Sequence, residues 1–182
     1  MQGADGGFGE IRTIDANERE PRAGADSPSP DEWAALRSWA SELAVQVGRE
    51  QPTEHVAVFI PDPPAGGLRL AAQVWGAGED TGEVRVGDWV VPFDGSICGR
   101  VYRTGLAALC ADVAMDPDFR SWPGSRTRSF LTVPVGPPGA VVAVVNVEAP
   151  WVSYFSIRDY ERLTARAAAA AVSWPLAPVS GG

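Results

Sequence analysis

The stretch DGSICGRVYRTG, residues 94–105, is the most informative part of this sequence. It predicts a short helix over about residues 95–104, because Asp94 or Ser96 can cap its first turn and Gly105 can end it. Cys98 falls in that first turn, where unsatisfied backbone N–H groups can lower the pKa of a thiol. The alternative interpretation of Cys98 is a small apolar residue buried under a pocket.

Upstream of this helix the pattern predicts a long helix and then a β-hairpin. The stretch SPDE, residues 29–32, is a capping box with proline at the first helical position, and Gly48 is expected to end the helix. Residues 55–60 form a β-branched run and residues 68–74 alternate at period two, with a turn rich in Pro and Gly between them. A short third strand is expected at Val84 and Val86.

Downstream, the pattern predicts strands and a final helix. A strand is expected around residues 106–113, then an acidic turn or short helix at 115–120 and a loop at 121–127. Two strands, residues 129–135 and 140–147, flank the turn GPPG and form a hairpin. A second capping box at residues 156–159 opens the last helix, which Pro175 ends.

Composition indicates one domain of the α+β class. The chain has 182 residues, of which 45% are hydrophobic, enough for one core. We expect a flexible arm at residues 1–28, the domain at 29–175 and a flexible tail at 176–182. A net charge of -8 argues against nucleic acid and anionic membranes, and no apolar run could span a bilayer. These features and the sparse cysteines predict a cytoplasmic protein.

Several phrases, in order, resemble the GAF domain family. Residues 94–105 resemble its turn that launches a helix ending at Thr-Gly. The segment from Asp112 to Phe119 resembles its "D-V…D-P" phrase, and residues 128–135 resemble its Arg-Ser entry into a strand ending in Val-Pro. The resemblance covers about residues 33–172. It implies a central antiparallel sheet of about five to six strands, with the terminal helix pair on one face and a ligand pocket on the other.

The resemblance also implies function, as a sensor that binds a small ligand without turnover, with a signalling protein as a possible partner. The ligand-binding residues expected in the pocket are Trp75, Ser96, Cys98, Asp112, Phe119, Trp122, Arg128 and Ser129. A homodimer through the terminal helices is expected to use the apolar stripes Trp33, Leu36, Ala40, Leu43, Val47, Leu163 and Trp174. An alternative is a degenerate GAF module whose pocket is filled and which acts as a dimerisation or protein-interaction domain.

A third alternative is catalysis like that of the free methionine sulfoxide reductases, whose Gly-Val-Cys-Gly phrase resembles residues 96–99. The partner cysteines of those enzymes have no counterpart here, so no catalytic residue is assigned. No metal or cofactor is expected either, because Cys98, Cys110 and His55 fit no zinc spacing, and neither cysteine precedes a histidine as in bilin attachment. His55 is expected to be an exposed or capping residue rather than a haem ligand.

Overall fold

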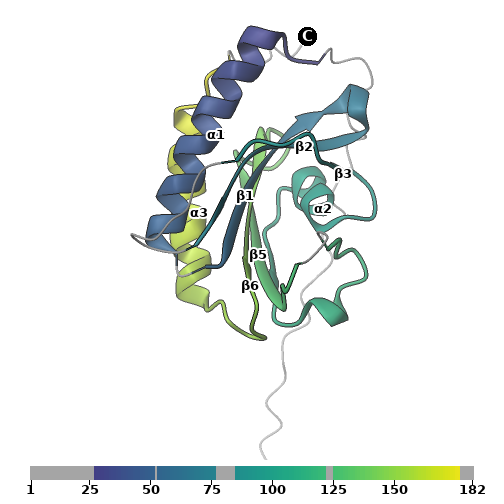
Figure 1. The fold of residues 1–182 in the computed structure, drawn as a ribbon, viewed down its shortest axis with the longest axis vertical. Coiled ribbons are helices and arrows are strands. Elements are labelled where there is room, and N and C mark those ends of the chain that lie inside the picture. The colour runs from purple at the N-terminus through teal and green to yellow at the C-terminus, as the bar shows by residue number, and fades with distance from the viewer. Residues whose placement is uncertain (1–26, 52, 77–84, 122–124, 177–182) are drawn as a thin grey trace, which may run out of the picture.

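The computed structural model describes residues 27–51, 53–76, 85–121 and 125–176 (Figure 1). The helices are α1 (Pro30–Glu50), η1 (Pro63–Ala65), α2 (Ile97–Thr104), η3 (Val113–Met115) and α3 (Ile157–Val172). The strands are β1 (His55–Asp62), β2 (Gly67–Trp75), β3 (Val90–Pro92), β4 (Ala108–Cys110), β5 (Ser129–Val135) and β6 (Ala143–Ala149). The fold is therefore α+β, as the sequence predicts.

The strands form one sheet of six, in the order β3-β2-β1-β6-β5-β4, and each neighbouring pair is antiparallel. The two hairpins expected from the sequence supply β1–β2 and β5–β6. The pairing that joins them is β1 with β6, where His55 lies opposite Glu148. This long-range pairing places the first and last strands of the domain, β1 and β6, side by side at the centre of the sheet.

Helices α1 and α3 lie side by side on one face of the sheet, and α2 lies on the other (Figure 1). Both terminal helices begin with the expected capping boxes, Ser29 with Glu32 and Ser156 with Asp159. Their apolar stripes pack against alternate residues of the central strands, such as Val145 in β6. A second, smaller core lies between α2 and the opposite face of the sheet.

Two elements differ from the sequence predictions. Helix α1 continues through Gly48 to Glu50, because Gly48 is buried inside the helix and Gln51 provides the C-cap. The third strand is β3, not residues 84–86: Arg85 makes only an isolated bridge to Gln73, and Val84 lies outside the described residues. No helix in the described part of the chain is long and apolar enough to cross a membrane.

Candidate functional site

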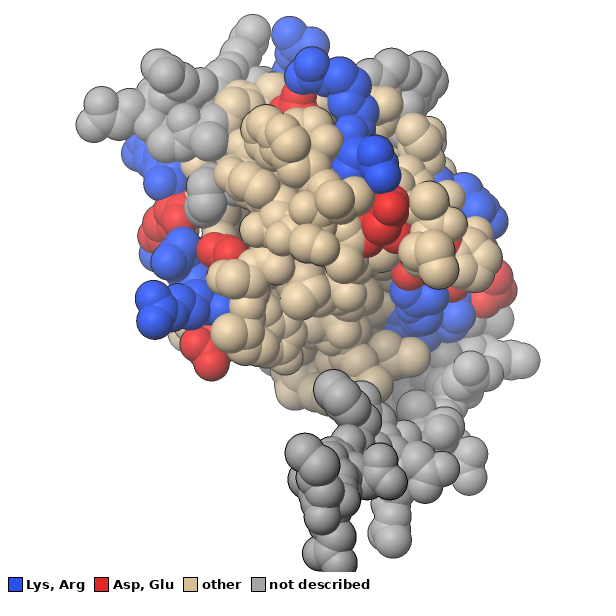
Figure 2. All heavy atoms as spheres, turned by 90° about the horizontal axis from the view of Figure 1, so that it is seen from below, with Lys and Arg blue, Asp and Glu red and all other residues tan. Residues whose placement is uncertain are grey.

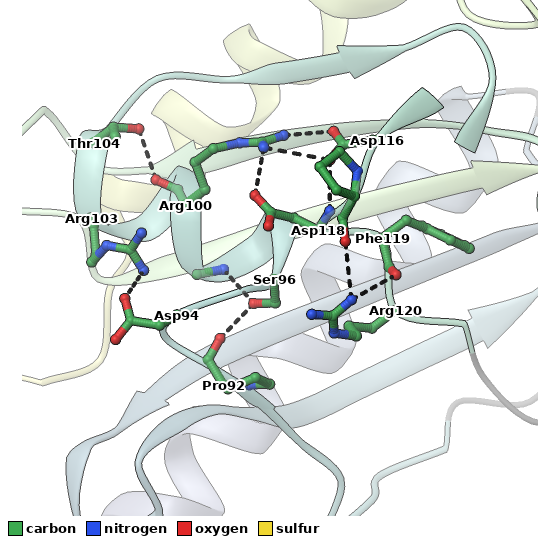
Figure 3. Close-up of polar contacts among 12 residues, drawn as sticks. Pro92, Asp94, Ser96, Arg100, Arg103, Thr104, Asp116, Asp118, Phe119 and Arg120 are labelled. Carbon is green, nitrogen blue, oxygen red and sulfur yellow. Dashed lines mark hydrogen bonds and ion pairs between the residues drawn. The ribbon is translucent and has the colours of Figure 1, made fainter. Parts of the chain in front are cut away.

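Helix α2 is held close to the sheet by its first turn (Figure 3). The Ser96 hydroxyl accepts a hydrogen bond from the Gly99 N–H at 3.0 Å and donates one to the Pro92 carbonyl at 2.5 Å. Gly99 has no room for a side chain, because a Cβ there would lie 2.1 Å from the Phe93 carbonyl oxygen. The phrase at residues 94–105 therefore sets how closely α2 approaches β3.

Under α2 lies a small cavity of about 30 Å³, which we call the α2 cavity. This volume suffices for about one or two water molecules. Aromatic rings and aliphatic groups form most of its wall, and a few polar groups face it. Its lining comprises Phe59, Trp89, Val91, Ser96, Ile97, Cys98, Asp118, Phe119, Arg120, Phe130, Asn146 and Glu148.

The floor of the cavity carries a buried carboxylate. Glu148 and Asn146 alternate with the core residues of β6, so both face α2 rather than α1 and α3. Glu148 accepts hydrogen bonds from Asn146 Nδ2 at 2.7 Å and from the Thr127 hydroxyl at 2.6 Å. Asn146 Oδ1 in turn accepts from the Thr132 hydroxyl at 2.6 Å, so the floor is a connected polar network.

His55, on the neighbouring strand β1, lies opposite Glu148 and pairs with its carboxylate. Its Nδ1 lies 3.5 Å from Glu148 Oε2, and its Nε2 lies 3.0 Å from Gln73 Oε1. Burial alone raises the pKa of Glu148, but the hydrogen bond and charge of His55, with the bonds from Thr127 and Asn146, outweigh burial and hold that pKa below its ordinary value. Glu148 is therefore a stabilised buried anion. The expectation that His55 is exposed or capping is wrong, because the β1–β6 pairing buries it almost completely.

Arg100 of α2 forms ion pairs with Asp116 and Asp118 at the outer side of the cavity. Its Nη2 lies 2.7 Å from Asp116 Oδ2 and its Nη1 lies 2.7 Å from Asp118 Oδ2 (Figure 3). The hydrogen bond to Asp116 raises the pKa of the Arg100 guanidinium. Burial raises the pKa of Asp116, but the hydrogen bonds from Arg100 and from the Asp118 N–H outweigh it, so the net shift is downward. Arg100 and Asp116 thus stabilise each other's charged form.

Cys98 faces the cavity as a buried thiol. Burial raises its pKa, and the nearby charge of Glu148 raises it further. Of the two interpretations of Cys98, the one in which the helix N-terminus lowers this pKa is contradicted, because desolvation outweighs the backbone hydrogen bond. The alternative interpretation, a small residue buried under the pocket, describes its position. Among the described residues, no group of three or more His, Cys, Asp or Glu side chains could hold a metal ion.

Three of the predicted ligand-binding residues, Ser96, Cys98 and Phe119, line the α2 cavity. Trp75 does not, because it lies at the end of β2 and stacks on His55 with ring centroids 4.1 Å apart. Trp122 lies outside the described residues.

The predicted Asp112, Arg128 and Ser129 also do not line the cavity. Asp112 pairs with Arg128 at 3.1 Å, and this contact joins η3 to the start of β5. Ser129 is fully buried and has the same alternation as Leu131, so it belongs to the face covered by the terminal helices. Its neighbour Phe130 takes the place in the cavity wall that was expected for Ser129.

The residues predicted for a dimer interface mostly belong to the core of a single chain. Those fully or almost fully buried are Leu36, Ala40, Leu43, Val47 and Leu163, all of which pack toward the sheet. They are therefore unavailable to a second copy. Trp33 and Trp174 are only partly buried, and Trp174 packs edge-on against Trp39 at 4.9 Å.

A second hollow lies at the end of the sheet near the loop between β6 and α3. It measures about 410 Å³ and is lined by Thr53, Glu54, Arg126, Pro150, Trp151 and Tyr154. Seen from below, this end presents a broad uncharged area bordered by arginine and acidic side chains (Figure 2). Trp151 and Tyr154 are exposed here, but among the described residues that line the hollow none is a buried charged group comparable to Glu148. The α2 cavity is therefore the stronger candidate site.

No protein-family model matches the sequence, and no curated protein matches it. Solved structures do resemble the fold. The GAF domain of an Acinetobacter phosphoenolpyruvate-protein phosphotransferase superposes with a TM-score of 0.64 and 18% identity, over 84% of this chain and 95% of that one. This chain has a GAF-like fold. The predicted antiparallel sheet with the terminal helix pair on one face is confirmed.

Other similar structures belong to proteins with different functions. Free methionine-R-sulfoxide reductase from Neisseria meningitidis, solved with its substrate, has a TM-score of 0.60 and 19% identity over 84% of this chain and 95% of that one. The GAF-B domain of DevS from Mycobacterium smegmatis has a TM-score of 0.56 and 18% identity over 75% of this chain and 90% of that one. At these identities the likeness concerns the GAF-like fold, which hosts more than one function.

Proposed function

We propose that this GAF-like domain is a sensor that binds a small molecule at the α2 cavity without turning it over. The observation that carries the proposal is the Glu148 carboxylate, buried at the cavity floor and held anionic by His55, Thr127 and Asn146. Burying a charged group is costly in free energy unless the group is paired and hydrogen-bonded. An ammonium or N–H donor of a small ligand would match the charge of Glu148, and the aromatic rings around it suit an apolar body, although entry requires the cavity to widen beyond its about 30 Å³.

Binding without turnover is supported by the raised pKa of the Cys98 thiol. A nucleophilic cysteine needs a thiolate, yet burial and Glu148 both raise the pKa of Cys98. Cys110 donates its S–H to the Asp112 carbonyl at 3.1 Å, and its pKa is also raised by burial. Neither thiol has the character of an activated nucleophile.

The proposal is tested with a panel of small amines, free amino acids and amides in a thermal-shift assay on the wild-type protein and on Glu148→Gln. A ligand that stabilises the wild type should lose most of its effect in Glu148→Gln, while Glu42→Gln, an exposed acid on α1, should respond as the wild type does. A ligand that binds both variants equally would place its site elsewhere. Absence of any bound species in native mass spectrometry of protein from its own host would also count against the proposal.

The second candidate is a module for protein interaction in the cytoplasm, with a closed cavity. Its support is the cavity volume of about 30 Å³, which is far below the roughly 300–1,000 Å³ of ordinary ligand pockets. A homodimer through α1 and α3 would then have to use Trp33 and the outward faces of these helices. Sedimentation of a monomer at high concentration would eliminate the homodimer.

A further inference from the structure

The turn formed by residues 116–120, here named the 116–120 turn, closes the α2 cavity on its outer side. Asp118, Phe119 and Arg120 all line the cavity. In the other walls, residues such as Phe59, Ile97 and Phe130 are buried within the second core, whereas Phe119 of the turn is only partly buried against that core. A ligand that enters by displacing this turn therefore disturbs the least packing.

Several polar contacts of this turn stay within it. The Asp118 N–H donates to Asp116 Oδ1 at 3.0 Å, and the Phe119 N–H donates to the Asp116 carbonyl at 3.1 Å. Arg120 donates to the Pro117 carbonyl at 3.1 Å. These bonds shape the turn as a unit, but they do not tie it to the helix beside it.

Arg100 supplies the tie to α2, through its 2.7 Å contacts to Asp116 and Asp118 (Figure 3). We propose that Arg100 is a latch that controls access to the α2 cavity by holding the 116–120 turn closed. This inference rests on the proposed binding function of the cavity and adds how entry to it is controlled. Arg100 does not line the cavity, so it acts through the turn rather than on the ligand.

The strength of the contact suits a latch. The Arg100 side chain is 38% exposed and its partners Asp116 and Asp118 are 15% and 31% exposed. Ion pairs with this much solvent access are weakened by salt and contribute modestly, so they can open and close without unfolding the domain. The stacking of Phe119 on Phe130, at 6.2 Å and 5°, keeps the closed turn in one position.

Cys98 offers a direct readout, because it lies in the cavity wall and is 8% exposed. In a Cys110→Ser background it is the remaining cysteine of the chain, and its alkylation by iodoacetamide reports opening of the cavity without any ligand. We expect Arg100→Gln to label about tenfold faster than the parent, because a charge-assisted, two-carboxylate contact is lost. Arg100→Lys should lie between them, since an ammonium is a point charge that lacks the planar fork.

The matched control is Arg103→Gln, which removes the contacts of Arg103 on the same helix to Asp94, at 2.8 Å, and to the Phe93 carbonyl without touching the 116–120 turn. Arg103→Gln should label at the parent rate. High salt should accelerate labelling of the parent but not of Arg100→Gln, a difference that a purely structural role would not produce.

Equal labelling of Arg100→Gln and the parent would overturn the latch. Acceleration in Arg103→Gln as well, accompanied by a lower Tm in both variants, would also overturn it, because general loosening would then be the cause. Failure of the proposed function looks different: labelling still depends on Arg100, but no compound shifts the Tm through Glu148.

Discussion

Replacing Glu148 by glutamine tests the buried network on which the candidate site depends. Glu148 Oε1 accepts from Asn146 Nδ2, while Oε2 accepts from the Thr127 hydroxyl and faces His55. An amide offers one oxygen where the carboxylate offers two, so one of these donors loses its acceptor in either orientation of the glutamine. An unsatisfied buried donor costs about 1–3 kcal/mol, and loss of the charge opposite a buried partner adds to it. We expect Glu148→Gln to lower the free energy of unfolding by about 3 kcal/mol at neutral pH.

The pH dependence gives a second, independent signature. The pKa of Glu148 in the folded protein lies below its ordinary value of 4.5. Its stabilising contribution is therefore fully present above that ordinary pKa and is lost as the pH falls through the lower, folded pKa. The free energy of unfolding of the wild type should consequently fall with acid more steeply than that of Glu148→Gln.

The assay is equilibrium unfolding in urea, followed by tryptophan fluorescence at a series of pH values. Glu42→Gln, on the exposed side of α1, serves as the control and should stay within about 0.5 kcal/mol of the wild type. The reasoning is refuted if Glu148→Gln unfolds at the same urea concentration as this control, or if its acid dependence parallels that of the wild type.

Other predictions concern the fold. Leu36→Ala should destabilise the domain by about 2–5 kcal/mol in urea unfolding, because Leu36 is fully buried against the sheet. Gly99→Ala should lower the free energy of unfolding by about 1–3 kcal/mol or more in the same assay. The reason is that its Cβ would lie 2.1 Å from the Phe93 carbonyl oxygen. Gly139→Ala, with φ +81° but nothing within 4 Å, should cost only about 1–2 kcal/mol from backbone strain. Ser156→Ala removes the N-cap of α3. It should lower the free energy of unfolding by about 1 kcal/mol, seen as a lower Tm.

Local features could be predicted because their causes lie within a few residues. The capping boxes at Ser29 and Ser156 both form as expected, since the side chain and the backbone N–H that it caps are three residues apart. The cap of α2 at Ser96 and its end at Gly105 follow for the same reason. Gly48 was expected to end the first helix because glycine is common at helix C-termini. Here it is buried within α1, and the helix continues to Glu50.

The site could be predicted only in part. Ser96, Cys98 and Phe119 were found because the phrases of residues 94–119 carry them. Asn146 and Glu148 were missed, although two polar residues alternating with Val145 and Val147 in an otherwise apolar strand are a signal of a functional face. The dimer stripe was misassigned because an apolar helix face does not reveal whether a sheet or a second copy covers it.

By itself, the sequence determined most of the elements: which segments become the three α-helices, which form the two hairpins, and where α2 ends. These depend on periodicity, capping and turn residues, which act over short distances along the chain. The tertiary structure alone decided that β1 pairs with β6, and so placed His55 against Glu148 at the floor of the α2 cavity. No local rule encodes that pairing, because it is selected by burial of the whole sheet against α1 and α3.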